Sequence, residues 1–225
     1  MAKEDIFVKS DRQVFDFNDG HGPVPAHRHP NGLGWIADSA YAEEGVFIDR
    51  TAQVCEKAQI LGAASVKQYA QIRGEALVTE LAQVWGHAVI EGQAHISGSC
   101  QIFDNARCQD RVQVLDNARV FGDAVVQGQA RVQDNAWIYE RAKVCDQTVI
   151  TGTARVYGEA TVCEKSKVSG YARIFGQAVL SGECKVSGNA QILDQAQISG
   201  SCQILGLCVV AGNTMIADDT IFFET

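Results

Sequence analysis

The sequence predicts an all-β solenoid, a parallel β-helix built from very short strands. An aliphatic residue recurs at every sixth position from Ile36 to Ile216, and only Ala42 and Cys108 in that series are not Ile, Val or Leu. Four positions after each of them stands a small residue, which is Ala in 21 of 30 cases. Two positions after each aliphatic residue the chain has Gly in 16 cases and Asp in 8, and both residue types suit tight corners.

Residues 1–35 precede the repeat and are predicted to form an N-terminal capping segment. They are charged and non-periodic, and they contain all three prolines of the chain, Pro23, Pro25 and Pro30. Because proline has no backbone N–H, its absence from the repeat is expected if every repeat donates to a parallel hydrogen-bond ladder.

Residues 36–217 form the repetitive body, and residues 218–225 form a short C-terminal tail. Within each hexad the small residue and the aliphatic residue two positions later point inward, and the residue between them points outward, which describes a short strand. The Gly or Asp that follows describes a corner. A helix does not explain the pattern, because a 3.6-residue turn would spread a six-residue period around the whole cylinder.

The pattern A-x-V-x-G-x-A resembles that of the hexapeptide-repeat proteins of the left-handed parallel β-helix class. In that class three hexads make one triangular coil. The resemblance covers residues 36–216 and implies a left-handed, single-stranded parallel β-helix of about ten triangular coils. Together with the leader GPVPAHRHPNGLGWIADSA, the pattern is similar to the YdcK-like branch, a transferase-like group. The usual enzyme branch places Gly or an acidic residue directly after the aliphatic one, whereas this chain places it one position later.

Net charge, apolar runs and cysteine spacing argue against several classes of function. A formal charge of −8 argues against a general affinity for nucleic acid or anionic membranes. No apolar run approaches the roughly 18 residues of a membrane span, and the N-terminal residues lack an apolar signal core, so we expect no membrane contact and a cytoplasmic location. The eight cysteines include no C-x-x-C spacing, and we expect free thiols, including Cys145 and Cys163, which stand one coil apart.

Positions that are three hexads apart stack if three hexads make one coil, and one outward column is then unusually large and apolar. Beside it, two residues earlier, runs a second column rich in arginine. The two columns are Trp85, Phe103, Phe121, Tyr139, Tyr157, Phe175 and Leu193, and Gln83, Gln101, Arg119, Trp137, Arg155, Arg173 and Gln191. The sequence therefore predicts an aromatic and basic face for self-association or a protein partner. Two alternatives stay open, a ladder that only stabilises the strands, and stacking of single-stranded nucleic acid or glycan.

Few residues are candidates for catalysis or metal binding. Enzymes of the hexapeptide class use a histidine base near a coil boundary in a trimer, and the resemblance makes His87 and His95 the candidates for that role. The γ-class carbonic anhydrases share the fold and bind metal through three histidines, but their local two-histidine spacing is absent here. The leader instead has His21, His27 and His29, which could form a zinc-like set or could hydrogen-bond the first coil.

We therefore expect a rigid β-helical scaffold or recognition protein that works without a cofactor. The first alternative is an acyltransferase-like enzyme with its site between subunits, and only this alternative calls for coenzyme A or zinc. The second alternative is an acidic decoy that inhibits a nucleic-acid-binding protein, which the net charge of −8 suggests.

Overall fold

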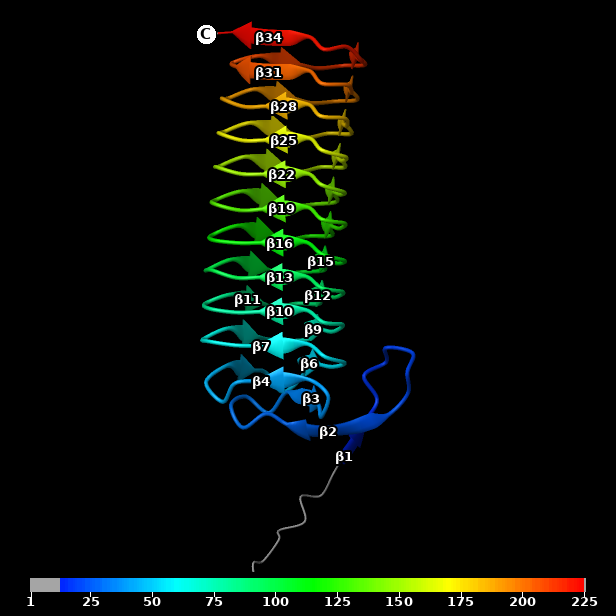
Figure 1. Cartoon of the computed structure of the whole chain (residues 1–225), viewed down its shortest axis with the longest axis vertical. Coiled ribbons are helices and arrows are strands. Elements are labelled where there is room, and N and C mark those ends of the chain that lie inside the picture. The colour runs from blue at the N-terminus through cyan, green and yellow to red at the C-terminus, as the bar shows by residue number, and fades with distance from the viewer. Residues whose placement is uncertain (1–12, 225) are drawn as a thin grey trace, which may run out of the picture.

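The structure is a computed structural model that describes residues 13–224 of the chain. Those residues form 34 strands and no helix, so none of them belongs to a helix long and apolar enough to cross a membrane. The strands stack into three long sheets around one axis, and the molecule is a prism (Figure 1). The predicted all-β, parallel β-helical fold class is confirmed.

Each coil contributes one strand to each of three faces. The first face stacks β3 (Trp35–Ala37), β6 (Gln53–Val54), β9 (Gln71–Ile72), β12 (Val89–Ile90), β15 (Arg107–Cys108), β18 (Val125–Val126), β21 (Lys143–Val144), β24 (Thr161–Val162), β27 (Val179–Leu180), β30 (Gln197–Ile198) and β33 (Met215–Ile216). The second face stacks β4 (Tyr41–Ala42), β7 (Gln59–Ile60), β10 (Leu77–Val78), β13 (His95–Ile96), β16 (Gln113–Val114), β19 (Arg131–Val132), β22 (Val149–Ile150), β25 (Lys167–Val168), β28 (Lys185–Val186), β31 (Gln203–Gly206) and β34 (Ile221–Glu224). The third face stacks β5 (Phe47–Ile48), β8 (Ser65–Val66), β11 (Gln83–Val84), β14 (Gln101–Ile102), β17 (Arg119–Val120), β20 (Trp137–Ile138), β23 (Arg155–Val156), β26 (Arg173–Ile174), β29 (Gln191–Ile192) and β32 (Val209–Val210).

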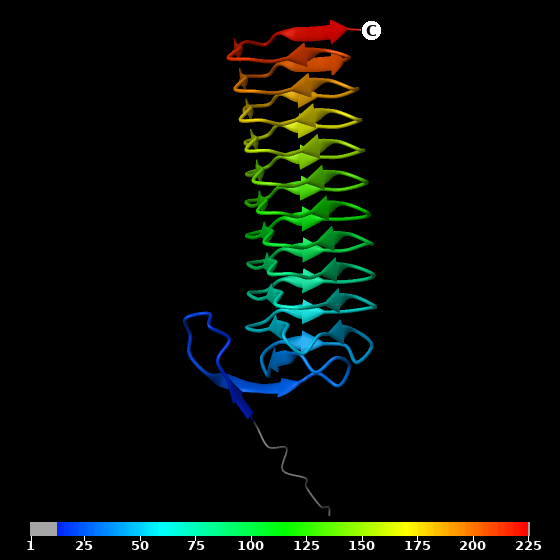
Figure 2. The ribbon, with the colours of Figure 1, turned by 180° about the vertical axis from the view of Figure 1, so that it is seen from behind.

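The coil is left-handed. In Figure 1 the second-face strands lie nearest the viewer and run to the left while the chain climbs, and the third-face strands run to the right behind them. Figure 2 gives the same sense from behind. The second face has 11 strands, so the chain makes about eleven turns where the sequence predicts about ten. The eleventh strand of the second face is β34, which lies in the C-terminal tail and pairs in parallel with β31.

The strand register pairs positions that are three hexads apart throughout the repeat. Gln101 pairs with Arg119, and Arg119 pairs with Trp137. The backbone ladder continues past the two-residue strands: the amides of Gln101, Phe103 and Asn105 donate to carbonyls of the next coil over 2.9–3.1 Å. Every side chain of the repeat therefore lies above the side chain at the same position of the previous coil.

The interior is a single apolar column. From Val46 to Ile204 both inward positions of each hexad are fully buried, as at Ala118 and Val120, and one continuous cluster runs from Ile36 to Val210. At two of the buried small inward positions the residue is polar, and its hydroxyl donates to a backbone carbonyl: Thr148 to Val162 and Ser166 to Gly182. The small residue is required because three faces converge on the axis and leave room for only one large side chain per hexad.

The segment before the repeat covers the first coil. The strands β1 (Gln13–Phe15) and β2 (Val24–Arg28) pair antiparallel, and β2 pairs antiparallel with β3. A second small core forms where Phe15 stacks on Trp35 at 4.4 Å, beside the buried Phe17. The loop between β1 and β2 rises along the side of the first coils (Figure 1).

The corners explain why the chain uses Gly or an acidic residue at one position. The backbone there is left-handed, with φ of 81° at Gly98 and 65° at Asp110. A Cβ at Gly98 would lie 2.6 Å from the amide nitrogen of Asp116, so glycine allows close approach of the coils. At most acidic corners the carboxylate accepts a hydrogen bond from the corner amide of the next coil, as Asp110 does from Gly128 at 2.9 Å.

We expect Asp110→Ala to lower the free energy of unfolding by about 1–2 kcal/mol, because it removes this hydrogen bond and leaves a residue poorly suited to positive φ. Asp110→Gly should cost less, since glycine adopts that backbone freely. Urea unfolding followed by circular dichroism measures both. The neighbouring exposed Arg111→Ala is the control, and an equal loss in that variant would contradict the interpretation.

Candidate functional site

Six aromatic side chains form a continuous stack on the third face. Each follows a two-residue strand of that face, and neighbouring ring centroids are 4.4–5.0 Å apart with interplanar angles of 0–6°. We call this set the aromatic ladder: Trp85, Phe103, Phe121, Tyr139, Tyr157 and Phe175. The structure thus brings together the predicted aromatic column, which the register between coils holds in line.

The ladder differs from the predicted exposed apolar patch in one respect. Its six residues are half-buried, because each inner ring is covered on both faces by the rings above and below. The inner rings therefore present only their edges to the solvent. A ligand that must stack on an aromatic face, such as an unpaired base or a sugar ring, therefore finds no free face on the inner rings.

The arginine-rich column lies beside the ladder on the same face. Trp137 sits between Arg119 and Arg155, whose guanidinium carbons are 5.1 and 4.7 Å from the indole ring. These three residues line a shallow groove of about 370 Å³ with five polar neighbours, Ser99, Gln101, Asn117, Asn135 and Thr153. Arg173 follows on β26 and is exposed. The cation–π contacts hold the arginines in place and leave their N–H groups for a partner.

The two tyrosines of the ladder are hydrogen-bonding groups rather than acids. Burial raises the pKa of Tyr139 and that of Tyr157 above the ordinary phenol value. Both hydroxyls therefore stay protonated at neutral pH, where they can donate and accept hydrogen bonds.

The two candidate catalytic histidines lie on different parts of the prism. His87 is exposed at the corner after the third face and stacks on Tyr69 with ring centroids 5.0 Å apart. His95 is half-buried in β13 on the second face. The structure does not bring these two rings together within one chain.

The three leader histidines have separate partners. His21 Nδ1 lies 3.5 Å from the Asp19 carboxylate, and His27 Nδ1 lies 2.9 Å from that of Asp38. His29 is buried; a ring protonated at Nε2 donates to the Glu43 carbonyl and accepts from the Asn31 amide. His27 and His29 thus contact residues of the first coil, whereas His21 contacts Asp19 within the leader. None of the three belongs to a metal-binding group within residues 13–224.

All eight cysteines are free thiols in the structure. Burial raises the pKa of Cys55, Cys100 and Cys145 to about 12 and raises that of Cys163 as well. These groups are protonated at neutral pH, which disfavours nucleophilic catalysis.

Within residues 13–224 two clusters bring thiols and carboxylates together, and of these the sequence indicated only the pair Cys145 and Cys163. One contains Cys145, Asp146 and Cys163, and the other contains Asp19, Cys55 and Glu56. The available signal was the triplet Val-Cys-acid, which occurs at 54–56, at 144–146 and at 162–164. Stacking of successive coils places the triplets at 144–146 and 162–164 next to each other.

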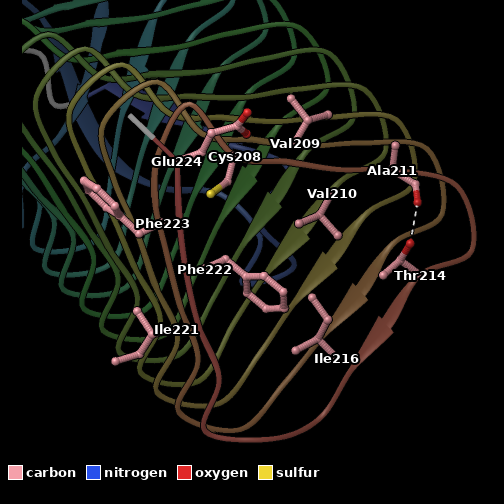
Figure 3. A pocket seen from close by; sticks show the side chains of 10 residues that line it. All are labelled: Cys208, Val209, Val210, Ala211, Thr214, Ile216, Ile221, Phe222, Phe223 and Glu224. Carbon is pink, nitrogen blue, oxygen red and sulfur yellow. Dashed lines mark hydrogen bonds between the residues drawn. The ribbon is translucent and has the colours of Figure 1, made fainter.

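The last coil contains an apolar hollow of about 600 Å³. Figure 3 shows Val210, Ile216 and Phe222 at its centre, on the axis of the prism. Its titratable lining residues are Cys208 and Glu224. The hollow continues the apolar interior, and this lining does not assemble an acid–base pair with a nucleophile.

No family model matches the chain, and none of the curated proteins compared with it matches.

We expect Phe121→Ala to lower the free energy of unfolding by about 1–3 kcal/mol, because it removes the stacking on Phe103 and Tyr139 and the edge contact with Trp137. A double-mutant cycle with Tyr139→Ala should give a coupling of about 0.5–1.5 kcal/mol, measured by urea unfolding. Leu115→Ala, at the equivalent position of the second face, is the control partner. Strictly additive losses for Phe121 and Tyr139 would contradict the stacking contribution.

Proposed function

We propose that this protein is a rigid β-helical scaffold whose third face binds a second copy of the chain or another protein. The observation that carries the proposal is the aromatic ladder beside Trp137, Arg119, Arg155 and Arg173. Tyrosine, tryptophan and arginine are the residues that most often anchor protein–protein interfaces. A face that combines all three on adjacent columns suits that use.

The geometry favours a protein over a nucleic acid or a glycan as partner. Ring edges and hydroxyl groups can pack against side chains, whereas the covered ring faces offer no stacking platform. The net charge of −8 also opposes a polyanion, while the local arginines complement an acidic protein surface.

Rigidity supports binding by a shallow surface. The backbone ladder holds each contact residue in position before a partner arrives, so association costs little ordering entropy. A flat face of short strands can then bind through many small contacts without a deep pocket.

The first alternative is an acyltransferase-like enzyme, and it rests on the resemblance to the hexapeptide-repeat class and its YdcK-like branch. In that case a site between subunits would combine His87 or His95 of one chain with residues of another, and it would take coenzyme A or zinc. The second alternative, an acidic decoy for a nucleic-acid-binding protein, rests on net charge alone. For all three functions we propose a cytoplasmic location without membrane contact.

We expect light scattering after size exclusion to give a wild-type mass of two or more times the 24.3 kDa of one chain. Tyr139→Glu and Arg173→Glu should each reduce the mass toward the monomer, because they introduce negative charge at the face. Lys167→Glu, an exposed site on the second face, is the control with the same charge change as Arg173→Glu. A monomeric wild type would contradict self-association, and partner capture that is unaffected by both third-face variants would contradict the face itself.

Under the scaffold proposal we expect calorimetry to detect no binding of coenzyme A. His87→Ala and His95→Ala should leave the solution mass unchanged, since neither ring lies in the ladder. Binding of coenzyme A that is lost in either variant would favour the acyltransferase alternative.

A further inference from the structure

A cluster of two thiols and a carboxylate lies at the corner that follows the first face, away from the aromatic ladder. The sulfurs of Cys145 and Cys163 and a carboxylate oxygen of Asp146 all lie within 4.8 Å of one another. Cys145 and Asp146 follow β21, and Cys163 follows β24 in the next coil. Both cysteines occupy the same outward position of their hexads, so the register itself aligns the sulfurs.

The spacing suits a tetrahedral metal ion. With metal–sulfur and metal–oxygen bonds of about 2.3 and 2.1 Å, neighbouring ligand atoms lie roughly 3.4–3.8 Å apart. The separations in the structure, all within 4.8 Å, are close to those distances. Two sulfurs with one oxygen form a ligand set that prefers zinc-like ions over magnesium or calcium.

The hydrogen bonds around the cluster indicate which carboxylate can bind a metal ion. Asp146 accepts the Glu164 amide with Oδ2 at 3.0 Å, which fixes the side chain and leaves its other oxygen for a ligand. The Glu164 carboxylate is directed to the corner amide of Gly182 at 2.9 Å. Asp146 is therefore the acidic ligand of the cluster, held by a backbone contact to the coil that carries Cys163.

The cluster is accessible to an ion from the solvent. Cys145 is 7% exposed, Cys163 is half-buried and Asp146 is exposed, so the cluster opens to the surface at one side. A groove lined by Asp146, Gln147, Glu164 and Lys165 adjoins it. A bound ion would keep its fourth position toward this side for water or another ligand.

We propose that Cys145, Cys163 and Asp146 form a binding site for one thiophilic divalent cation of the zinc class, which links two adjacent coils. On binding, each thiol loses its proton to solvent, two metal–sulfur bonds and one metal–oxygen bond form, and no oxidant or reductant is required. The site is independent of the third face and of the leader histidines.

Cobalt(II) titration of the reduced full-length protein tests this proposal, because thiolate ligation gives a sulfur-to-cobalt charge-transfer band. We expect one equivalent to bind with such a band and zinc to displace it. Cys163→Ser should abolish the band, and Asp146→Asn should keep it while weakening affinity about 10–100-fold. Zinc should raise the unfolding temperature of the wild type but not of Cys163→Ser.

Two control variants make the assignment specific. Cys55→Ser alters the other thiol-containing cluster, and Cys100→Ala alters a buried inward cysteine, and both should bind cobalt as the wild type does. Absence of a charge-transfer band in the wild type would overturn the proposal. So would a band that survives in Cys163→Ser or disappears in Cys55→Ser. Circular dichroism of each variant confirms that loss of binding is not loss of fold.

Discussion

The register of the backbone ladder, which advances by three hexads from coil to coil, is the constraint on which the rest of the structure depends. Because the amide of one coil donates to the carbonyl of the next at every strand, each side chain stacks on its equivalent in the neighbouring coil. Any residue type that recurs at that interval becomes a physical column. The apolar interior, the corner hydrogen bonds, the aromatic ladder and the cysteine pair are four consequences of one register. A single inserted residue would shift all four columns at once.

Stacking between coils also limits which parts of a side chain can contact a partner. The rings of the aromatic ladder cover one another, so the ladder contributes to the stability of the rod and presents only edges to a partner. The same side chains can therefore both stabilise the rod and contact a partner. The arginines beside Trp137 supply charge and directional hydrogen bonds that ring edges lack.

The rod leaves little room for chemistry of the usual kind, since its corners are tight and its interior is filled by small and aliphatic residues. His87 and His95 lie on separate parts of the prism, and the leader histidines are engaged by Asp19, Asp38 and the backbone near the first coil. What the register can assemble is a set of ligands from successive coils. Two thiols and a carboxylate at one corner are such a set, and the pairing of β21 with β24 brings together the coils that carry them.

The sequence by itself determined the β-helix, the inward and outward positions, the corners and the membership of each column, because these follow from a period that no insertion interrupts between Ile36 and Ile216. It also predicted which aromatic residues form the ladder. Only the tertiary structure decided that β34 joins the second face, that the rings are half-buried, and that Asp146 lies beside Cys163. The reason is physical: periodicity fixes which residues are neighbours, whereas burial and ligand geometry depend on side-chain orientation between coils, which a one-dimensional pattern does not contain.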